Sequence, residues 1–486
     1  MFNFIFSHIP ALAMATFVLN FVIAAVIIFL ERKNPSTTLA WCLILFLLPI
    51  IGAFLYFMLS NIFIRNKVMK YTTEEEALIQ ASLQRQMADM ECGNYEFNSP
   101  NTLIWMDMLK LHQILGKAYY TQDNEIEIIT DGKEMFDALL NDIKNAKISI
   151  DILYFIVKPD EVGMKFLNAL TEKAKEGVQV RLLADGLGSK RLNRKVLKDY
   201  RAAGGKFVFF FPLRLKYINP KLNYRNHRKL VIIDDAIGYL GGFNIGREYL
   251  GLKKKFGYWR DTQLRIRGSA IQDMKVRFLL DWRVAAKEKI MIHEAYASKI
   301  NGNGTTGIQI VSSGPHTSKE EVKRGFNKMI TTAQRKIWIQ TPYFVPSGSL
   351  QENLKVAILS GVDVRIMIPS MPDHLFVYWA TWSYIGVLLR LGAKVYIYDN
   401  GFLHAKTMVV DGEVSTAGTA NFDRRSFKLS FETNVFIYGS KEAKMMEDIF
   451  IKDLENCHEL TAEAYARRGT WIKAKESICR LLSDLL

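Results

Sequence analysis

Two stretches of this chain carry the same reactive side chains at the same spacing. The first set is His227, Lys229, Asp234 and Asn244, and the second is His404, Lys406, Asp411 and Asn421. An imidazole can serve as nucleophile, acid or base, because its unperturbed pKa is about 6.5. A lysine charge and an asparagine amide can hold phosphate oxygens. Together the two sets predict phosphodiester chemistry, in which one histidine attacks phosphorus and the other protonates the departing alcohol.

The spacing also predicts how each set is held. Residues two apart on a strand face the same way, so His227 and Lys229 can reach one ligand, as can His404 and Lys406. Apolar runs follow at residues 230–233 and 407–410, which would bury each strand and fix its polar end. We group Asp234 and Asp411 with the catalytic set, although bracing the site suits them better than touching substrate. A single histidine at a strand start would usually be structural, but its exact repetition favours catalysis.

Both sets match the HxKxxxxD signature, so the chain resembles the phospholipase D superfamily. The resemblance implies two-step transfer through a phosphohistidine, with His227 as nucleophile and His404 as acid and then base. It also places an orienting carboxylate beside each imidazole. We expect Asp261 to orient His227 and Glu432 to orient His404. Asp261 follows a longer insertion, which leaves an ordinary surface acid as its alternative role.

The motifs lie in two similar halves. Residues 147–150 match residues 336–339, Tyr154-Phe155 matches Tyr343-Phe344, residues 177–182 match 361–366, and Gly205-Lys206 matches Ala393-Lys394. Strand-like and helix-like segments alternate, which is typical of an α/β fold around a mainly parallel sheet. We therefore predict two phospholipase D-like α/β sandwich domains, at residues 121–300 and 301–486, related by pseudo-twofold symmetry.

Two apolar runs precede these halves. Residues 11–30 and 39–59 are each long enough to cross a bilayer, which needs about 20 apolar residues. We predict a transmembrane hairpin over residues 1–62 and a linker over residues 63–120. A secretory signal is the alternative for the first run, but residues 1–10 contain no lysine or arginine. A slight excess of basic residues after the second run favours a cytoplasmic body.

Composition limits the partners. The chain has 64 Lys and Arg against 49 Asp and Glu, a net charge of +15, which suits an anionic lipid surface or a nucleic acid. The four cysteines form no CxxC pair, so neither disulfides nor a zinc site are indicated. Residues 302–307 read GxGxxG but precede a strand-like run, which indicates a connection between the halves. We predict no cofactor and no metal.

Further sequence features narrow the resemblance to bacterial cardiolipin synthases. They are the turn at residues 31–35, Gly241–Gly246, Trp259–Thr262, Phe402–Lys406 and the Leu-Leu-Ser-Asp-Leu-Leu end. The resemblance implies that two phosphatidylglycerol molecules become cardiolipin and glycerol at the bacterial inner membrane, with phosphatidylglycerol and the anionic bilayer as partners and no nucleic acid. A membrane-bound phospholipase D or a nuclease remains the enzymatic alternative. A scaffold without activity would not need paired imidazoles.

Three other stretches have two interpretations each. Residues 374–389 are strongly aromatic and fit an acyl groove or a core helix. Lys253–Lys255 fit a headgroup contact or a solvated loop. Residues 471–486 have apolar side chains at helical spacing with basic neighbours, which fits either a helix at the membrane interface or one packed on the body.

Overall fold

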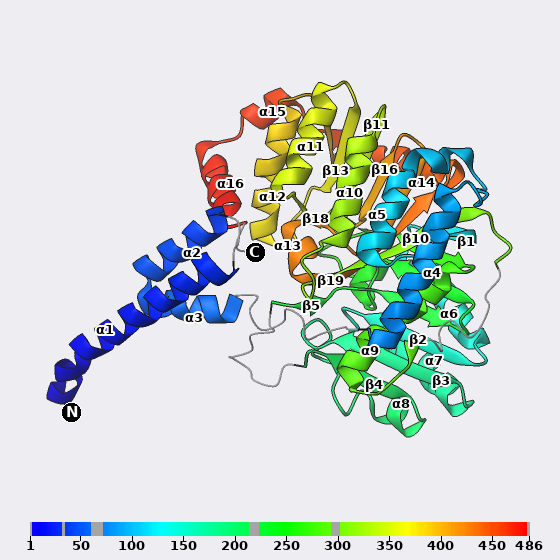
Figure 1. The fold of residues 1–486 in the computed structure, drawn as a ribbon, viewed down its shortest axis with the longest axis horizontal. Helices are drawn as coiled ribbons and strands as arrows, with labels where there is room; N and C mark the ends of the chain where they lie inside the picture. Colours follow the sequence, from blue (N-terminus) through cyan, green and yellow to red (C-terminus); the bar gives the residue numbers. More distant parts are fainter. Residues whose placement is uncertain (1, 32–34, 60–70, 213–222, 293–301, 484–486) are drawn as a thin grey trace.

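The computed structural model describes residues 2–31, 35–59, 71–212, 223–292 and 302–483 (Figure 1). A rounded body contains both motifs, and the N-terminal helices extend from one side of it. Residues 32–34 of the predicted turn and residues 484–486 of the C-terminal motif lie outside the described residues.

One continuous sheet runs through the body. Its first half has the order β4-β3-β2-β6-β7-β9-β1, and its second half continues as β10-β19-β17-β16-β11-β13-β14-β20. The strands of the first half are β1 (Thr121–Ile129), β2 (Ser149–Tyr154), β3 (Gln179–Asp185), β4 (Lys206–Phe210), β6 (Leu230–Ile233), β7 (Ile237–Gly241) and β9 (Gln263–Arg267). Those of the second are β10 (Thr306–Ser313), β11 (Lys336–Gln340), β13 (Asp363–Pro369), β14 (Lys394–Tyr398), β16 (Thr407–Val410), β17 (Val414–Gly418), β19 (Ser430–Tyr438) and β20 (Cys457–Glu459).

The expectation of a mainly parallel sheet is wrong. Only β2-β3-β4 and β11-β13-β14 are parallel along this sheet order, and the other neighbours are antiparallel. The reason lies in the connections, because β6 and β7 follow one another through a tight turn, as do β16 and β17. Each motif strand is therefore the first arm of an antiparallel hairpin.

The sheet register confirms the internal repeat and corrects part of its alignment. Ile150 pairs with Ile233, and Ile337 pairs with Val410. Since Ile233 and Val410 precede the two motif aspartates, Ile150 corresponds to Ile337, and not to Ile339 as the sequence match suggested. A shift of two residues keeps every side chain on the same face, so an alternating pattern alone does not reveal it.

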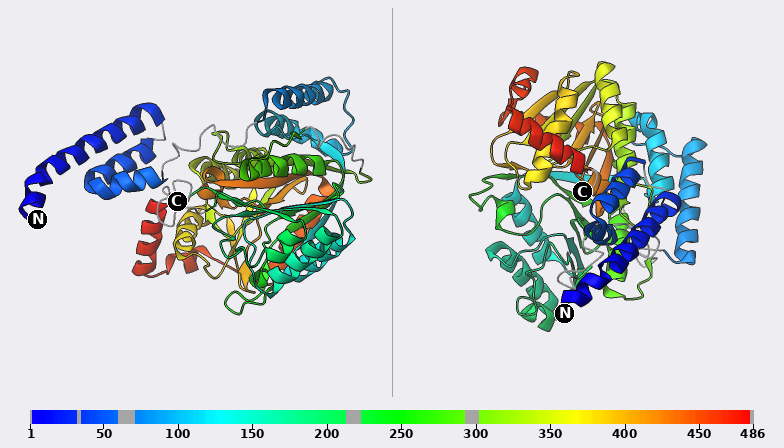
Figure 2. Two further views of the ribbon diagram at one scale, coloured as in Figure 1. Left: turned by 90° about the horizontal axis from the view of Figure 1, so that it is seen from below. Right: turned by 90° about the vertical axis from the view of Figure 1, so that its left-hand side faces the viewer.

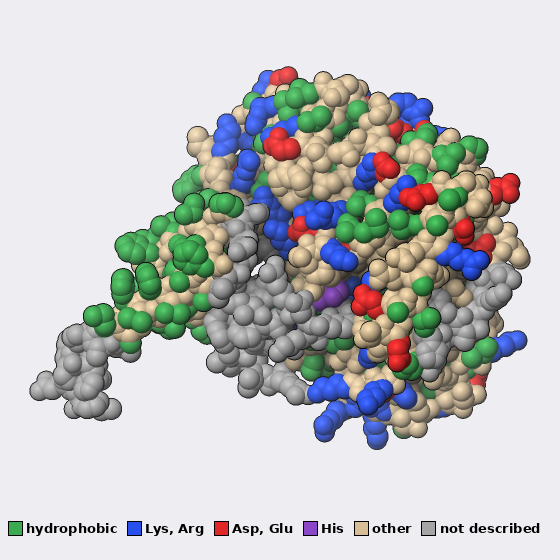
Figure 3. All heavy atoms as spheres, in the orientation of Figure 1, with side chains coloured by type: hydrophobic (Ala, Val, Ile, Leu, Met, Phe, Trp, Pro, Cys, Tyr) green, Lys and Arg blue, Asp and Glu red, His purple; other side chains and the backbone are tan. Residues whose placement is uncertain are grey.

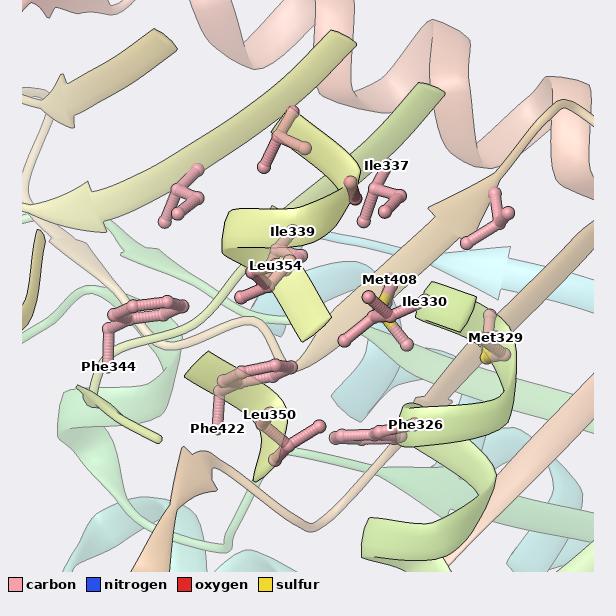
Figure 4. Packing of buried hydrophobic residues seen from close by; sticks show 14 of the residues in the cluster. Phe326, Met329, Ile330, Ile337, Ile339, Phe344, Leu350, Leu354, Met408 and Phe422 are labelled. Atoms are coloured by element: carbon pink, nitrogen blue, oxygen red, sulfur yellow. The ribbon is translucent and has the colours of Figure 1, made fainter. Parts of the chain in front are cut away.

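Helices cover both faces of the sheet. One face carries α9 (Ala270–Ala286) and α14 (Ser440–Leu454), above a core that takes residues from both halves, including Leu153, Leu240 and Val435. On the other face, α6 (Gly132–Asn145) and α7 (Glu161–Lys175) cover the first half. There α10 (Glu321–Thr332), α11 (Gly348–Leu359) and α12 (Leu375–Leu389) cover the second half. Phe326, Leu354, Ile337 and Met408 belong to one buried cluster between these helices and the sheet (Figure 4).

The predicted linker belongs to the folded body from residue 71 onward. It contains α4 (Thr73–Glu91), η3 (Pro100–Trp105) and α5 (Met106–Gly116). Trp105 and Met108 are buried in the same core as α10. At the start of α4, Glu75 pairs with Arg283 of α9 at 2.5 Å.

The N-terminal segment forms α1 (Phe2–Ala25), a π-helical turn η1 (Val26–Glu31), α2 (Pro35–Leu47) and α3 (Pro49–Leu59), which project from the body (Figure 2). The second predicted span is thus divided at Leu48. Within the described ranges, none of the helices combines the length and the apolar character needed to cross a membrane. The structure therefore does not show the predicted transmembrane hairpin. It does show large apolar side chains exposed on these helices, among them Phe17, Phe29 and Phe46 (Figure 3).

Candidate active site

A short parallel pairing between the halves positions His227. The two-residue strand β5 (Arg225–Asn226) pairs with the start of β19, so that Asn226 lies opposite Phe431. The His227 backbone N–H donates to the Phe431 carbonyl at 3.0 Å. His227 and Glu432 are the next residues along the two paired strands. The imidazole Nδ1 of His227 lies 3.1 Å from the Glu432 carboxylate.

The second motif repeats this arrangement. Here β15 (Phe402–Leu403) runs parallel to β8 (Trp259–Arg260), with Leu403 opposite Arg260. The His404 backbone N–H donates to the Arg260 carbonyl at 2.7 Å. His404 Nδ1 then lies 2.5 Å from the carboxylate of Asp261.

Each imidazole therefore contacts the carboxylate of the other half. This is the reverse of the expected pairs, in which Asp261 oriented His227 and Glu432 oriented His404. The spacing within one half locates each acid in the sequence. It does not show which strand, and so which histidine, lies beside that acid in the fold. Asp261 is nevertheless fully buried, so the alternative role as a surface acid is wrong.

The two lysines connect the motifs into one site. Lys229 Nζ donates to the His227 carbonyl at 2.6 Å, and Lys406 Nζ lies 2.9 Å from His404 Nδ1. Burial lowers the pKa of Lys229 to about 7; Glu432 and Asp261 oppose this change, and the charge of Lys406 adds to it. Burial also lowers the pKa of Lys406, again against both carboxylates. Because His227 Nδ1 lies 3.1 Å from Glu432 and Lys406 Nζ lies 4.0 Å from Asp261, groups of both halves meet in one site.

The surroundings of both imidazoles favour their neutral forms. Burial lowers the pKa of His404 to about 4, with help from Lys406 and against Asp261. Burial likewise lowers the pKa of His227, in spite of Glu432. Burial opposes ionisation of Asp261, but the charge of Lys406 and the hydrogen bond from His404 outweigh it and lower the pKa of this carboxyl. At His227, the Glu432 carboxylate beside Nδ1 favours the ring proton there and leaves the Nε2 lone pair available for attack.

Comparison with known proteins agrees with this geometry. The family model described as "Cardiolipin synthase, PLD-like domain" matches residues 139–282 and 326–454, which contain both motifs and both carboxylates. The chain belongs to the cardiolipin synthase family. A second model, described as "Phospholipase_D-nuclease N-terminal", matches residues 18–61.

Relatives in this family are similar along almost their whole length. The chain is 48% identical over 471 residues to the major cardiolipin synthase of Bacillus subtilis (strain 168), covering 97% of this chain and 98% of that one. It is 47% identical to a cardiolipin synthase of Oceanobacillus iheyensis, with the same coverage. A phosphatidylserine synthase of Haemophilus influenzae Rd KW20 has a similar fold, with a TM-score of 0.59 at 16% identity, covering 78% of this chain and 97% of that chain.

The motif asparagines are both buried in this family member. The Asn244 side-chain oxygen accepts from the Ile156 N–H at 3.0 Å, which directs the amide group. The side-chain oxygen of Asn421 is buried and has no hydrogen-bond partner within the described ranges. Phosphate binding by either amide stays a prediction.

Asp234 and Asp411 do not lie beside the histidines. Each is at the far end of its motif strand, roughly 20 Å away at about 3.3 Å per residue. The carboxylate of Asp234 accepts three backbone N–H groups at residues 147–149, and that of Asp411 accepts three at residues 334–336. They hold the starts of β2 and β11, which corrects their grouping with the catalytic side chains.

Two buried arginines were missed by sequence reasoning. Arg228 pairs with Asp281 of α9 at 2.7 Å and donates to the Glu432 carbonyl at 3.2 Å. Arg260 pairs with Asp453 of α14 at 2.7 Å and also donates to the Asp261 carbonyl. Each arginine thus ties the backbone of one orienting carboxylate to a helix. The available signal was Arg228 itself, a charge between His227 and Lys229 where the second motif has Ala405.

Proposed function

We propose that this protein is a phosphatidyltransferase that makes cardiolipin from two phosphatidylglycerol molecules through a phosphohistidine. The observation that carries the proposal is the pair of imidazoles, each held at Nδ1 by a carboxylate and both beside buried lysines. The family supplies the substrate class, since its named relatives are cardiolipin synthases.

The proposed chemistry has two displacements. Nε2 of His227 attacks the phosphorus of the first phosphatidylglycerol, and the bond from phosphorus to the glycerol oxygen breaks. His404 supplies the proton to that oxygen, because the phosphate anion of the bound lipid favours the charged form of the imidazole. The hydroxyl of a second phosphatidylglycerol then gives its proton to His404, attacks phosphorus and displaces His227. Two inversions give retention at phosphorus.

Product analysis tests the reaction. Purified enzyme with labelled phosphatidylglycerol in detergent micelles should form cardiolipin and free glycerol, with neither CTP nor divalent metal present. Phosphatidic acid as the dominant product would instead indicate the hydrolase, and cleavage of a nucleic acid would indicate the nuclease. No turnover by intact enzyme would favour the scaffold.

The identity of the nucleophile is tested by trapping. Enzyme quenched during turnover of phosphate-labelled lipid should carry an acid-labile adduct on the peptide that contains His227. An adduct on the His404 peptide would reverse the two roles. Inverted stereochemistry without an adduct would contradict the covalent path.

We further propose that the N-terminal helices insert into the inner membrane as a hairpin, with the body in the cytoplasm. The exposed apolar side chains of α1 to α3 support insertion, since side chains such as Phe46, 77% exposed, would otherwise contact water. Cysteine labelling of intact cells tests the orientation. A cysteine near residue 34 should react with an impermeant reagent, and one near residue 70 should not. The reverse pattern would contradict it.

A further inference from the structure

One face of the last described helix is exposed to solvent. Helix α16 (Thr470–Leu482) exposes Trp471 by 79%, Ile478 by 58% and Leu481 by 79%. These positions are seven and ten residues apart, so they share one side of a helix. Together they form an apolar surface, which we call the α16 face.

The opposite face of the same helix is firmly attached. Glu476 and Cys479 are buried, and Glu476 pairs with Arg468 at 2.8 Å. The Tyr384 hydroxyl of α12 lies 3.0 Å from the Ser483 hydroxyl. The guanidinium of Arg480 lies 5.0 Å from the Tyr384 ring centroid. The exposure of the α16 face is therefore not due to poor packing of the helix.

The residues around this face are basic. Lys473, Lys475 and Arg480 are the exposed charged residues of α16, and exposed Arg467 precedes the helix. The only acid within α16 is the buried Glu476. An exposed tryptophan with aliphatic neighbours and a cationic border fits the boundary between anionic headgroups and acyl chains.

The position of α16 favours the same partner. It lies on the side of the body from which α1 to α3 project, close to α2 (Figures 1 and 2). Leu375, at the start of the neighbouring α12, is also exposed, by 66%. Asp373, two residues earlier, accepts from the Tyr343 hydroxyl and acts electrostatically on His404. A surface bound by α16 would thus lie near the second motif.

We propose that the α16 face is a second membrane contact, which inserts Trp471, Ile478 and Leu481 into the surface of an anionic bilayer. This inference extends the proposed function but does not depend on the reaction catalysed. The contact would fix how the body sits on the membrane and hold the site near lipid headgroups.

Measuring how deeply spin labels on α16 enter the bilayer, in the full-length protein, tests this proposal. Single spin-labelled cysteines at residues 471, 473, 477, 478, 480 and 481 would be placed in a variant whose native cysteines are replaced, and reconstituted in phosphatidylglycerol vesicles. Labels at 471, 478 and 481 should be accessible to oxygen and protected from a water-soluble nickel complex. Labels at 473, 477 and 480 should show the reverse. Nickel access at every position, or spin coupling between chains at 478, would overturn the proposal, the latter in favour of a second copy.

A functional test separates this contact from the chemistry. The triple variant Trp471→Ser, Ile478→Ser and Leu481→Ser should need about tenfold more phosphatidylglycerol per vesicle surface for half-maximal rate, yet match wild type in detergent micelles. Leu103→Ser, at a site 58% exposed on η3, is the matched control and should change neither rate. Equal vesicle kinetics for the triple variant and wild type would overturn the proposal. If the wild-type enzyme showed no cardiolipin synthesis, the proposed function would be contradicted. The depth measurements would still test the membrane contact of α16.

Discussion

The two histidines contact different carboxylates, and the surroundings of those carboxylates differ as well. Glu432 accepts the Thr419 hydroxyl at 2.5 Å, whereas Asp261 accepts the Thr262 N–H at 2.8 Å. The position equivalent to Thr419 is Gly242, where an added Cβ would come within 1.9 Å of the Asp261 carboxylate. The first half therefore needs glycine at position 242, because the Asp261 carboxylate occupies the space that a side chain would take. The halves have become unequal where the two imidazoles need different roles.

Removing the charge of each carboxylate should block a different step. Glu432→Gln should prevent adduct formation, because Nδ1 of His227 loses the acceptor that favours an available Nε2. Asp261→Asn should allow some adduct but slow its breakdown, because His404 becomes a poorer base. Each should reduce kcat by about 10²- to 10⁴-fold. Quenched-flow measurement of the adduct distinguishes them, and accumulation in Glu432→Gln instead would contradict the crossed pairs.

The pH dependence of kcat/KM should report the ionisation of Lys229. In the proposed reaction this lysine would hold phosphate only in its charged form, and burial lowers its pKa to about 7. The kcat/KM value should therefore fall as pH rises through about 7, while kcat falls only at higher pH because bound phosphate favours the charged lysine. In the Lys229→Arg variant this decrease of kcat/KM with rising pH should disappear, whatever rate the variant retains. A kcat/KM that is constant from about pH 6 to about pH 9 would contradict this role.

At the scale of elements, two short strand pairs determine the site. β5 and β15 contribute two residues each, and their register against β19 and β8 sets which acid meets which histidine. The arginines Arg228 and Arg260 tie those registers to α9 and α14. Orientation of the imidazoles thus depends on buried charges outside the motifs.

Breaking one of these charge pairs should destabilise the protein. Asp281→Leu leaves the fully buried Arg228 without its main partner and should cost about 3–5 kcal/mol of unfolding free energy. Adding Arg228→Met should recover most of that stability but not the activity, because the tie to the Glu432 carbonyl is lost. Denaturant unfolding and turnover would be measured together. Recovery of both properties would show that Arg228 has no positioning role.

The bracing role of Asp411 predicts the opposite pattern. Asp411→Asn tolerates the left-handed backbone at this position, φ 56°, but loses acceptor capacity for the N–H groups of residues 334–336. The free energy of unfolding should fall by about 1–2 kcal/mol, which lowers the Tm by several degrees. The kcat should be nearly unchanged at low temperature. His404→Gln is the comparison, because it keeps a donor for the buried Asp261 and should lose almost all turnover with little change in Tm. A large loss of kcat in Asp411→Asn would return this residue to the catalytic set.

Sequence patterns predicted the motifs, the repeat and the α/β class, because these depend on spacing along one strand or on periodicity. They did not predict the crossed carboxylates, which depend on strands distant in the chain. They also missed the tight turns that make β6-β7 and β16-β17 antiparallel hairpins. The shift between Ile337 and Ile339 was hidden because both point the same way from β11. Residues 71–116 looked polar, yet Trp105 and Met108 complete a core of the second half.

At the scale of the molecule, both halves contribute to one site. The antiparallel contact of β1 with β10 joins them into one sheet, and α9 and α14 share a core. Neither half contains a histidine together with its own orienting acid. The site therefore requires the complete body.

This arrangement predicts that inactive variants will not complement each other. His227→Ala mixed with His404→Ala should remain inactive at all ratios, because every chain lacks one of the two imidazoles of its only site. Turnover of the mixed, reconstituted proteins measures this directly. Activity near a quarter of wild type or above would mean that sites are assembled between chains.

The convergence of two motifs on one centre also limits how substrates take turns. Donor and acceptor must use the same phosphoryl position, so glycerol has to leave before the second lipid can react. Because one phosphodiester replaces another of similar energy, the same centre can run backward when glycerol is abundant. The cardiolipin content of the membrane would then follow the removal of glycerol as well as the amount of enzyme.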